Sequence, residues 1–215
     1  MTRFRFCRPA FLILARYAVA RCVVASCLAV CCFAHGQDYY PNQEVRIGDL
    51  PSLTAKSRDA SDVLVASVEI IFRDKEVCCG KNSALEDSVQ RADPMSLKDI
   101  GARLQGRHLL SDGRPFLVTA EYLPAAAVNS GQLIGALMEK HAPLMEWNSR
   151  LYVVYGVIFD ETLDLSTGAR MDAIRKFLLL DARFSNARRQ VSFDRLTDDW
   201  GKVQGLLMLT AAPQP

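Results

Sequence analysis

The hydrophobic pattern at the start of the chain separates a leader from the rest. Residues 22–34 form an apolar run of 13 residues, which is shorter than the roughly 20 residues needed to span a bilayer. Five arginines lie within residues 3–21, and Ala34-His35-Gly36 places small residues at the −3 and −1 positions of a cut before Gln37. Together these features predict a secretory signal peptide over residues 1–36.

This leader sets the expected location and leaves one alternative open. Val24-Ala25-Ser26-Cys27 would also allow lipidation at Cys27. The residues after Cys27 stay hydrophobic, whereas a lipoprotein usually turns polar there, so plain cleavage near Gly36 is favoured. We therefore expect a secreted or periplasmic protein without a stable membrane span after the signal is removed.

The chain after the leader is first polar and then strongly apolar. Residues 37–60 carry scattered charges and two prolines, and we expect them to form an N-terminal arm. Residues 63–72 (VLVASVEIIF) are rich in β-branched and aromatic side chains, which predicts a strand. The charged residues 73–76 predict a turn after it.

Start and stop signals predict two helices in the next segment. Ser83 and Glu86 fit a capping box, so a helix should begin directly after Ser83. Asp93-Pro94 suits the first turn of a second helix, and Gly106 is its expected stop. The apolar positions of this second helix recur at helical spacing: Leu97, Ile100 and Leu104.

The second half of the chain is mostly strand-like. Residues 151–159 (LYVVYGVIF) are almost continuously apolar, which predicts a central strand buried on both faces, and Gly156 indicates a close backbone approach or a bulge. Residues 130–140 predict a third helix. Because helices and strands segregate along the chain, the fold class is α+β. The third helix should bury Leu133, Leu137 and Met138; the strands are expected at 114–122, 142–147, 151–159, 174–180, 190–193 and 205–210, the last closing the sheet.

Charge and motif content exclude several classes of partner. The chain has 26 Lys and Arg against 24 Asp and Glu, a net charge of +2, but removal of the leader leaves 21 against 24, a net charge of −3. The basic balance therefore belongs to the leader, and no clustered basic face suggests a nucleic-acid partner. No metal-ligand spacing and no phosphate-binding glycine loop is present, so we expect no metal and no cofactor. Residues 61–212 are expected to form a single domain.

Cysteine usage points to one short stretch of the domain. Five of the seven cysteines lie in the leader, and only the adjacent Cys78 and Cys79 remain. Adjacent cysteines seldom bond to each other, because the closed ring strains the peptide between them. The sequence leaves their redox state open: the pair either provides a free thiol for a purpose or is buried as two small hydrophobic residues.

Four short segments occur in a characteristic order. They are Cys-Gly before a helix of small residues (79–84, CGKNSA), a helix leading to an apolar segment with proline (137–145, LMEKHAPLM), a strand that resembles the form HxVVxxG without its histidine (151–157, LYVVYGV), and a strand ending in an acid (178–183, LLLDAR). This order resembles the compact bacterial papain-like cysteine peptidases, especially the double-glycine leader peptidase domain and its secreted relatives. The resemblance covers roughly residues 60–210. It implies N-terminal helices around a cysteine, followed by a mostly antiparallel sheet.

The resemblance also implies a site, from which this chain departs. Cys79 would be the nucleophile and Asp181 the acid that orients a catalytic imidazole. Arg150 occupies the place of the family's histidine, and although it could hold Cys79 as a thiolate and pair with Asp181, it cannot transfer a proton near neutral pH because its pKa lies above about 12. His141 is the alternative base, although a surface or capping role is favoured for it, and for His108 as well.

Three hypotheses follow from these residues. The first is an exported papain-like domain that has lost, or nearly lost, its catalytic base and binds peptides or peptidoglycan-type amides in the old cleft. The second is an active cysteine peptidase or amidase that uses His141. The third is a structural or interaction protein in which the two cysteines are only buried.

Overall fold

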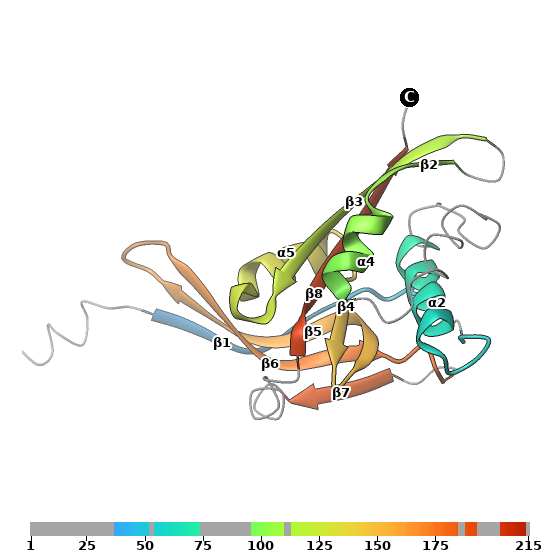
Figure 1. Ribbon diagram of the computed structural model, residues 1–215. Coiled ribbons are helices and arrows are strands. Elements are labelled where there is room, and N and C mark those ends of the chain that lie inside the picture. The colour runs from blue at the N-terminus through green and yellow to red at the C-terminus, as the bar shows by residue number, and fades with distance from the viewer. Residues whose placement is uncertain are drawn as a thin grey trace, which may run out of the picture. The chain divides into compact units, whose positions relative to one another are not determined.

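The computed structural model describes residues 37–51, 54–73, 96–109, 113–184, 188–192 and 203–213. Within these ranges it contains three α-helices, one 3-10 turn and eight strands (Figure 1). The expected α+β class and the mostly antiparallel sheet are confirmed. The helices are α2 (Ala60–Arg73), α4 (Leu97–Leu104) and α5 (Ser130–Met138), with η2 (Ala125–Ala127); the strands are β1 (Gln37–Arg46), β2 (Gly106–Leu109), β3 (Pro115–Pro124), β4 (Leu144–Trp147), β5 (Arg150–Asp164), β6 (Arg170–Leu180), β7 (Arg188–Ser192) and β8 (Val203–Pro213).

The sheet runs in the order β2-β3-β8-β4-β5-β6-β7, and β1 pairs with β5 outside this path. The last strand, β8, was expected to close the sheet, but it does not lie at an edge. β8 lies in the middle, because its apolar residues pair with β3 on one side and with β4 on the other. β5 is long enough to pair with β4 through its first residues and with β1 further along, where the Ile47 amide donates to the Tyr155 carbonyl at 2.8 Å.

The segment predicted as a strand at 63–72 is instead most of helix α2. Nearly all its side chains are buried, so neither the helical nor the strand period shows in the sequence, and the β-branched residues misled the prediction. Ser67, the one hydroxyl in the run, is fully buried and donates to the Val63 carbonyl at 2.7 Å. Asp62 lies in the first turn, where it interacts favourably with the helix dipole.

Helix α4 confirms the prediction made from Leu97, Ile100 and Leu104, all of which are buried. The described helix begins at Leu97, with Ser96 as its N-cap; the predicted start at residues 93–94 lies outside the described residues, as does the helix predicted after Ser83. The chain turns at Gly106, whose φ is +134°, directly into β2. The helix thus starts later than the predicted residues 93–94, because the backbone of Ser96 is extended and its side chain caps the helix, whereas the predicted end is correct.

Helix α5 confirms the third predicted helix and two of the three residues of its apolar stripe. Leu133 and Leu137 are buried, as is Ile134, whereas Met138 is 67% exposed. The Asn129 side chain caps the helix by accepting from two backbone amides. Met138 is the last residue of the helix, and it lines a cavity instead of the core.

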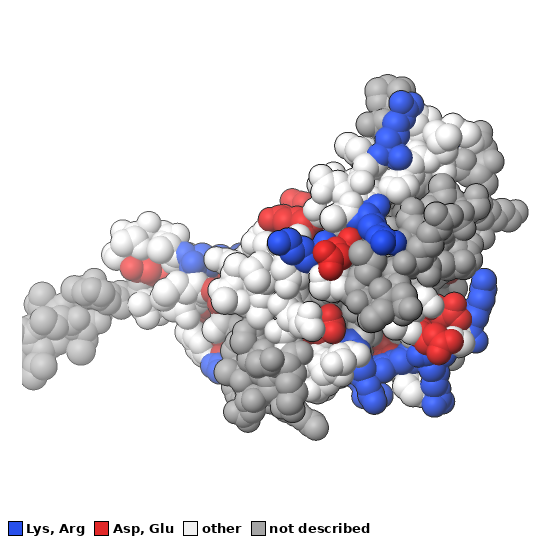
Figure 2. Space-filling model, viewed as in Figure 1, with Lys and Arg blue, Asp and Glu red and all other residues white. Residues whose placement is uncertain are grey.

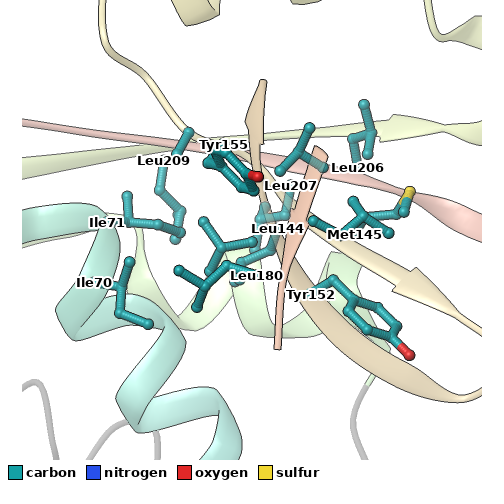
Figure 3. Close-up of a cluster of buried hydrophobic side chains, with 14 of the residues drawn as sticks. Ile70, Ile71, Leu144, Met145, Tyr152, Tyr155, Leu180, Leu206, Leu207 and Leu209 are labelled. Carbon is teal, nitrogen blue, oxygen red and sulfur yellow. The ribbon is translucent and has the colours of Figure 1, made fainter. Parts of the chain in front are cut away.

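Strand β5 confirms the predicted central strand, since Tyr152 to Val157 are all buried. A side-chain carbon at Gly156 would lie 2.6 Å from the Val45 carbonyl oxygen, so the expected close backbone approach is the contact with β1. Figure 3 shows how residues from α2, β4, β5, β6 and β8 converge on one core, with Ile70 and Ile71 of α2 pointing toward the strands. This core positions the ends of β4, β5 and β6.

The chain divides into two compact units. The larger comprises Tyr40–Glu161 and Asp172–Pro215; the smaller contains, among the described residues, 37–39 and 162–171. In the smaller unit the Asp164 carboxylate accepts from the Ser166 amide and hydroxyl and from the Thr167 amide. These bonds, those of Ser166 first, lower the pKa of Asp164 from 3.8 to about 2. All the residues of the site described next belong to the larger unit.

Candidate functional site

Asp181 is a fully buried carboxylate directly after β6. Both its oxygens bind Arg183: Nε donates to Oδ1 at 2.7 Å and Nη2 donates to Oδ2 at 2.6 Å. The Arg183 amide also donates to Oδ1 at 3.1 Å, which turns the chain back on itself. Two parallel bonds between a guanidinium and a carboxylate hold both groups in one orientation.

Arg183 connects this carboxylate to the start of β5. Its guanidinium donates to the Tyr152 hydroxyl at 3.3 Å, and its Cζ lies 5.5 Å from the centre of the same ring. The hydrogen bonds to Asp181, with a smaller contribution from Tyr152, outweigh the effect of burial and raise the pKa of Arg183 above its usual value. Tyr152 in turn packs against Trp147 of β4, with ring centres 5.9 Å apart. The buried Trp147 Nε1 has no hydrogen-bond partner in the structure among the described residues.

Further arginines surround this corner of the sheet. Arg58 lies 5.2 Å above the Phe184 ring, near where the Ala55 amide donates to the Ala182 carbonyl. On β7, Arg188 lies 5.3 Å above the Tyr155 ring, and Arg189 Nη2 is 3.9 Å from Asp181 Oδ2. Figure 2 shows basic side chains gathered at the lower right, beside the start of β7 as placed in Figure 1.

Arg150 lies at the first position of β5, opposite Trp147. The two residues between them, Asn148 and Ser149, have φ of 53° and 55°, as a tight two-residue hairpin turn requires. Arg150 is exposed at this turn. Because Tyr152 follows two residues later and contacts Arg183, the structure brings the start of β5 next to the end of β6, as the resemblance requires. The carboxylate of Asp181, however, is bound by Arg183.

His141 lies at the other end of β4. It follows α5, and its backbone amide donates to the Ala136 carbonyl at 2.8 Å. Its Nδ1 is 3.5 Å from the Glu139 carboxylate. The pairing of β4 with β5 begins at Leu144 and ends at Trp147, so a strand of four residues, about 10 Å from first to last, separates the His141 end from the Arg150 end. The capping role expected for His108 is supported by its 2.8 Å contact with the Leu104 carbonyl at the end of α4.

A cavity of about 300 Å³ lies near the His141 end. Its wall combines the end of α5 with the residues that lead out of β1. Charged side chains line it together with apolar ones, so it has room for a small polar group. Its lining residues are Val45, Arg46, Ile47, Gly48, Asp49, Leu137, Met138 and Lys140.

The predicted cysteine pair lies outside the described residues, and the described residues contain neither a metal-binding cluster nor a membrane-spanning helix. Cys79 and Cys78 lie outside the described residues. Across the ranges that are described, no three His, Cys, Asp or Glu side chains are grouped so as to hold a metal ion. In the same ranges, no helix has the length and apolar character needed to cross a bilayer.

The sequence argument missed Arg183, Arg188 and Arg189. Asp181 was predicted to orient an imidazole, although Arg183, two residues later, could bind its carboxylate. The sequence 181–183 (DAR) at the end of an apolar strand was the signal, because a carboxylate leaving a sheet can bind both the amide and the side chain two residues on. Arg188 and Arg189 lie just before the strand predicted at 190–193, and no role was predicted for them.

Comparison of the chain with models of known protein families, with curated proteins and with solved structures gives no match. The papain-like resemblance therefore remains a proposal that depends on this chain alone.

Proposed function

We propose that this protein is an exported papain-like domain that binds peptide-type amides and hydrolyses them poorly or not at all. Three features support the proposal. Helix α2 precedes the cysteine pair in the sequence, and a mostly antiparallel sheet follows it. Asp181, directly after β6, is bound by Arg183, which contacts Tyr152 near the start of β5. Cys79 would face that corner of the sheet.

The observation that carries the loss of activity is the bidentate bond between Asp181 and Arg183. In a working cysteine peptidase, the acid orients an imidazole that moves the proton. Here both oxygens of the acid are bound by a guanidinium, and Arg150 occupies the sequence position at which the resemblance would have the histidine. Loss of general acid–base catalysis costs about two to four orders of magnitude in rate. The proposal therefore expects peptide binding to persist while hydrolysis is slow or absent.

A peptidase that uses His141 is the second candidate. The cavity of about 300 Å³ near the end of α5 favours it, because a substrate group would have room there. The contacts of His141 oppose it, because its Nδ1 lies 3.5 Å from the exposed Glu139 carboxylate, whereas Asp181 is bound by Arg183. The two candidates make different predictions.

Two assays on the same protein test the proposal. Binding is measured by fluorescence polarisation with a labelled peptide library, and turnover by release of fragments from casein. The proposal expects binding without turnover, or with turnover that Arg150→His increases. Turnover that His141→Ala abolishes would replace it with the second candidate. Absence of both binding and turnover would leave the third hypothesis, a protein whose cysteines are only buried.

A further inference from the structure

The arginines of β7 lie on a free sheet edge. β7 is the last strand in the sheet order and pairs with β6 through residues 188–192. No described strand pairs with its second edge. An extended peptide can add to such an edge through backbone hydrogen bonds, while its side chains read the residues beside it.

The two arginines are held on opposite faces of this edge. Successive residues of a strand point to opposite faces, and the contacts agree: Arg188 stacks on the Tyr155 ring, while Arg189 points toward Asp181. The Arg189 side chain remains 45% exposed. Because the Asp181 carboxylate already forms two short hydrogen bonds to Arg183, its negative charge is largely balanced by Arg183 and does little to neutralise Arg189. Each face of the sheet beside this edge therefore carries one guanidinium, Arg188 over the Tyr155 ring of β5 and Arg189 toward Asp181.

We infer that the peptide bound by this protein adds as a strand to the β7 edge and carries two consecutive acidic residues opposite Arg188 and Arg189. Consecutive residues of an added strand point to opposite faces, so each acid would face one arginine, and opposite charges directly across a strand pair attract. The inference rests on the proposed function and names its ligand class, an extended acidic peptide.

Charge also argues against a second copy of this chain at the same edge. Two β7 strands would bring arginines against arginines, and like charges directly opposite each other destabilise a sheet. An exposed charged edge also discourages unspecific strand pairing. A partner strand that supplies acids meets neither obstacle.

The test uses the purified full chain and labelled nine-residue peptides of alternating Thr and Val. Their two central residues are Glu-Asp, Ser-Ser or Lys-Lys. At low salt we expect the Glu-Asp peptide to bind about 5- to 25-fold more tightly than the Ser-Ser peptide, since each exposed ion pair adds up to about five-fold. This preference should shrink as salt is added.

Two variants locate the effect. Arg188→Gln/Arg189→Gln should lose the preference for Glu-Asp and keep the affinity for Ser-Ser. Arg107→Gln is the matched control, because Arg107 is an exposed arginine on β2, the edge strand at the opposite end of the sheet, and it should keep the preference. Thermal unfolding of each variant confirms that it is folded.

Backbone methylation tests strand addition. Two Glu-Asp peptides carry N-methyl groups at alternate backbone nitrogens, in one register or the other. Only the register that faces β7 should lose binding, because only those amides join the ladder. Equal binding by both, or a preference that survives Arg188→Gln/Arg189→Gln, overturns the inference and leaves the proposed function standing. If none of the unmethylated peptides binds and the peptide library of the binding assay also fails, the proposed function fails as well.

Discussion

The Asp181 corner and the end of α5 differ in how their polar groups are used. In the corner, a buried carboxylate, a guanidinium and a tyrosine hydroxyl form one set of hydrogen bonds. At the end of α5, His141 contacts an exposed glutamate near a cavity of about 300 Å³. The corner pairs its buried acid with a guanidinium, whereas the end of α5 places an imidazole beside an exposed acid. This difference motivates the proposal of a domain that binds peptides without cleaving them efficiently.

Asp181→Ala should have the largest effect on stability. It leaves Arg183, whose side chain is only 13% exposed, without its counter-charge, which typically costs about 3–5 kcal/mol. Urea unfolding measures the change. The double variant Asp181→Leu/Arg183→Met should recover most of the loss, because an apolar pair replaces an ionic one without leaving a buried charge. A loss below about 1 kcal/mol for the single variant would show that the corner does not depend on this pair.

Tyr152→Phe should have an intermediate effect. It removes the hydroxyl that accepts from Arg183 while keeping the ring, and loss of one such hydrogen bond costs about 1–1.5 kcal/mol. Tyr155→Phe is the matched control, since Arg188 contacts its ring and no described hydrogen bond uses its hydroxyl. Equal destabilisation by the two variants in urea unfolding would contradict the role given to Arg183.

Loss of the contact between His141 and the exposed Glu139 should by itself change stability little in His141→Ala, by no more than about 0.5 kcal/mol. Any residual hydrolysis of casein should be unaffected. A fall of two orders of magnitude or more in the rate of hydrolysis, in a variant that unfolds like the parent, would identify His141 as the catalytic base.

Glu146→Gln should have the smallest effect. Burial raises the pKa of Glu146 in β4 above 4.5. The folded protein therefore binds this proton more readily than the unfolded chain does. At pH 7 the charged carboxylate lowers the stability of the folded state, and this loss of stability disappears as the pH falls through the raised pKa. Solvent screening limits the gain from Glu146→Gln at pH 7 to about 0.5 kcal/mol. Unfolding curves at pH 7 and pH 4 should differ in this sense; a loss of stability at pH 7 would refute it.

The sequence predicted the fold best where amphipathic or continuous patterns agreed with local signals. The spacing of Leu97, Ile100 and Leu104 located α4, and the apolar run in β5 located the central strand. The prediction failed at α2, because burial on nearly every side removed the periodic signal. It also misplaced β8, since the order of strands in a sheet depends on long-range pairing that no local pattern records.

The site was predictable only in part. The position of Asp181 near the start of β5 agrees with the resemblance, but its partner does not follow from the order of segments. Asp181 binds Arg183 because the chain turns directly after β6, which brings the side chain two residues on within 2.7 Å. That turn depends on the backbone conformation directly after β6, and residues 181–183 (DAR) are the only part of the sequence that indicated it.

Alkylation of Cys79 in the folded protein tests the central proposal, that this thiol faces Arg150 and the Asp181 corner. In a Cys78→Ser background, iodoacetamide at pH 6 should label Cys79 faster than a cysteine in an unstructured peptide, because a nearby guanidinium favours the thiolate. Arg150→Gln should slow the reaction. Labelling that begins only after the protein unfolds would contradict the claim and place the sulfur in the interior.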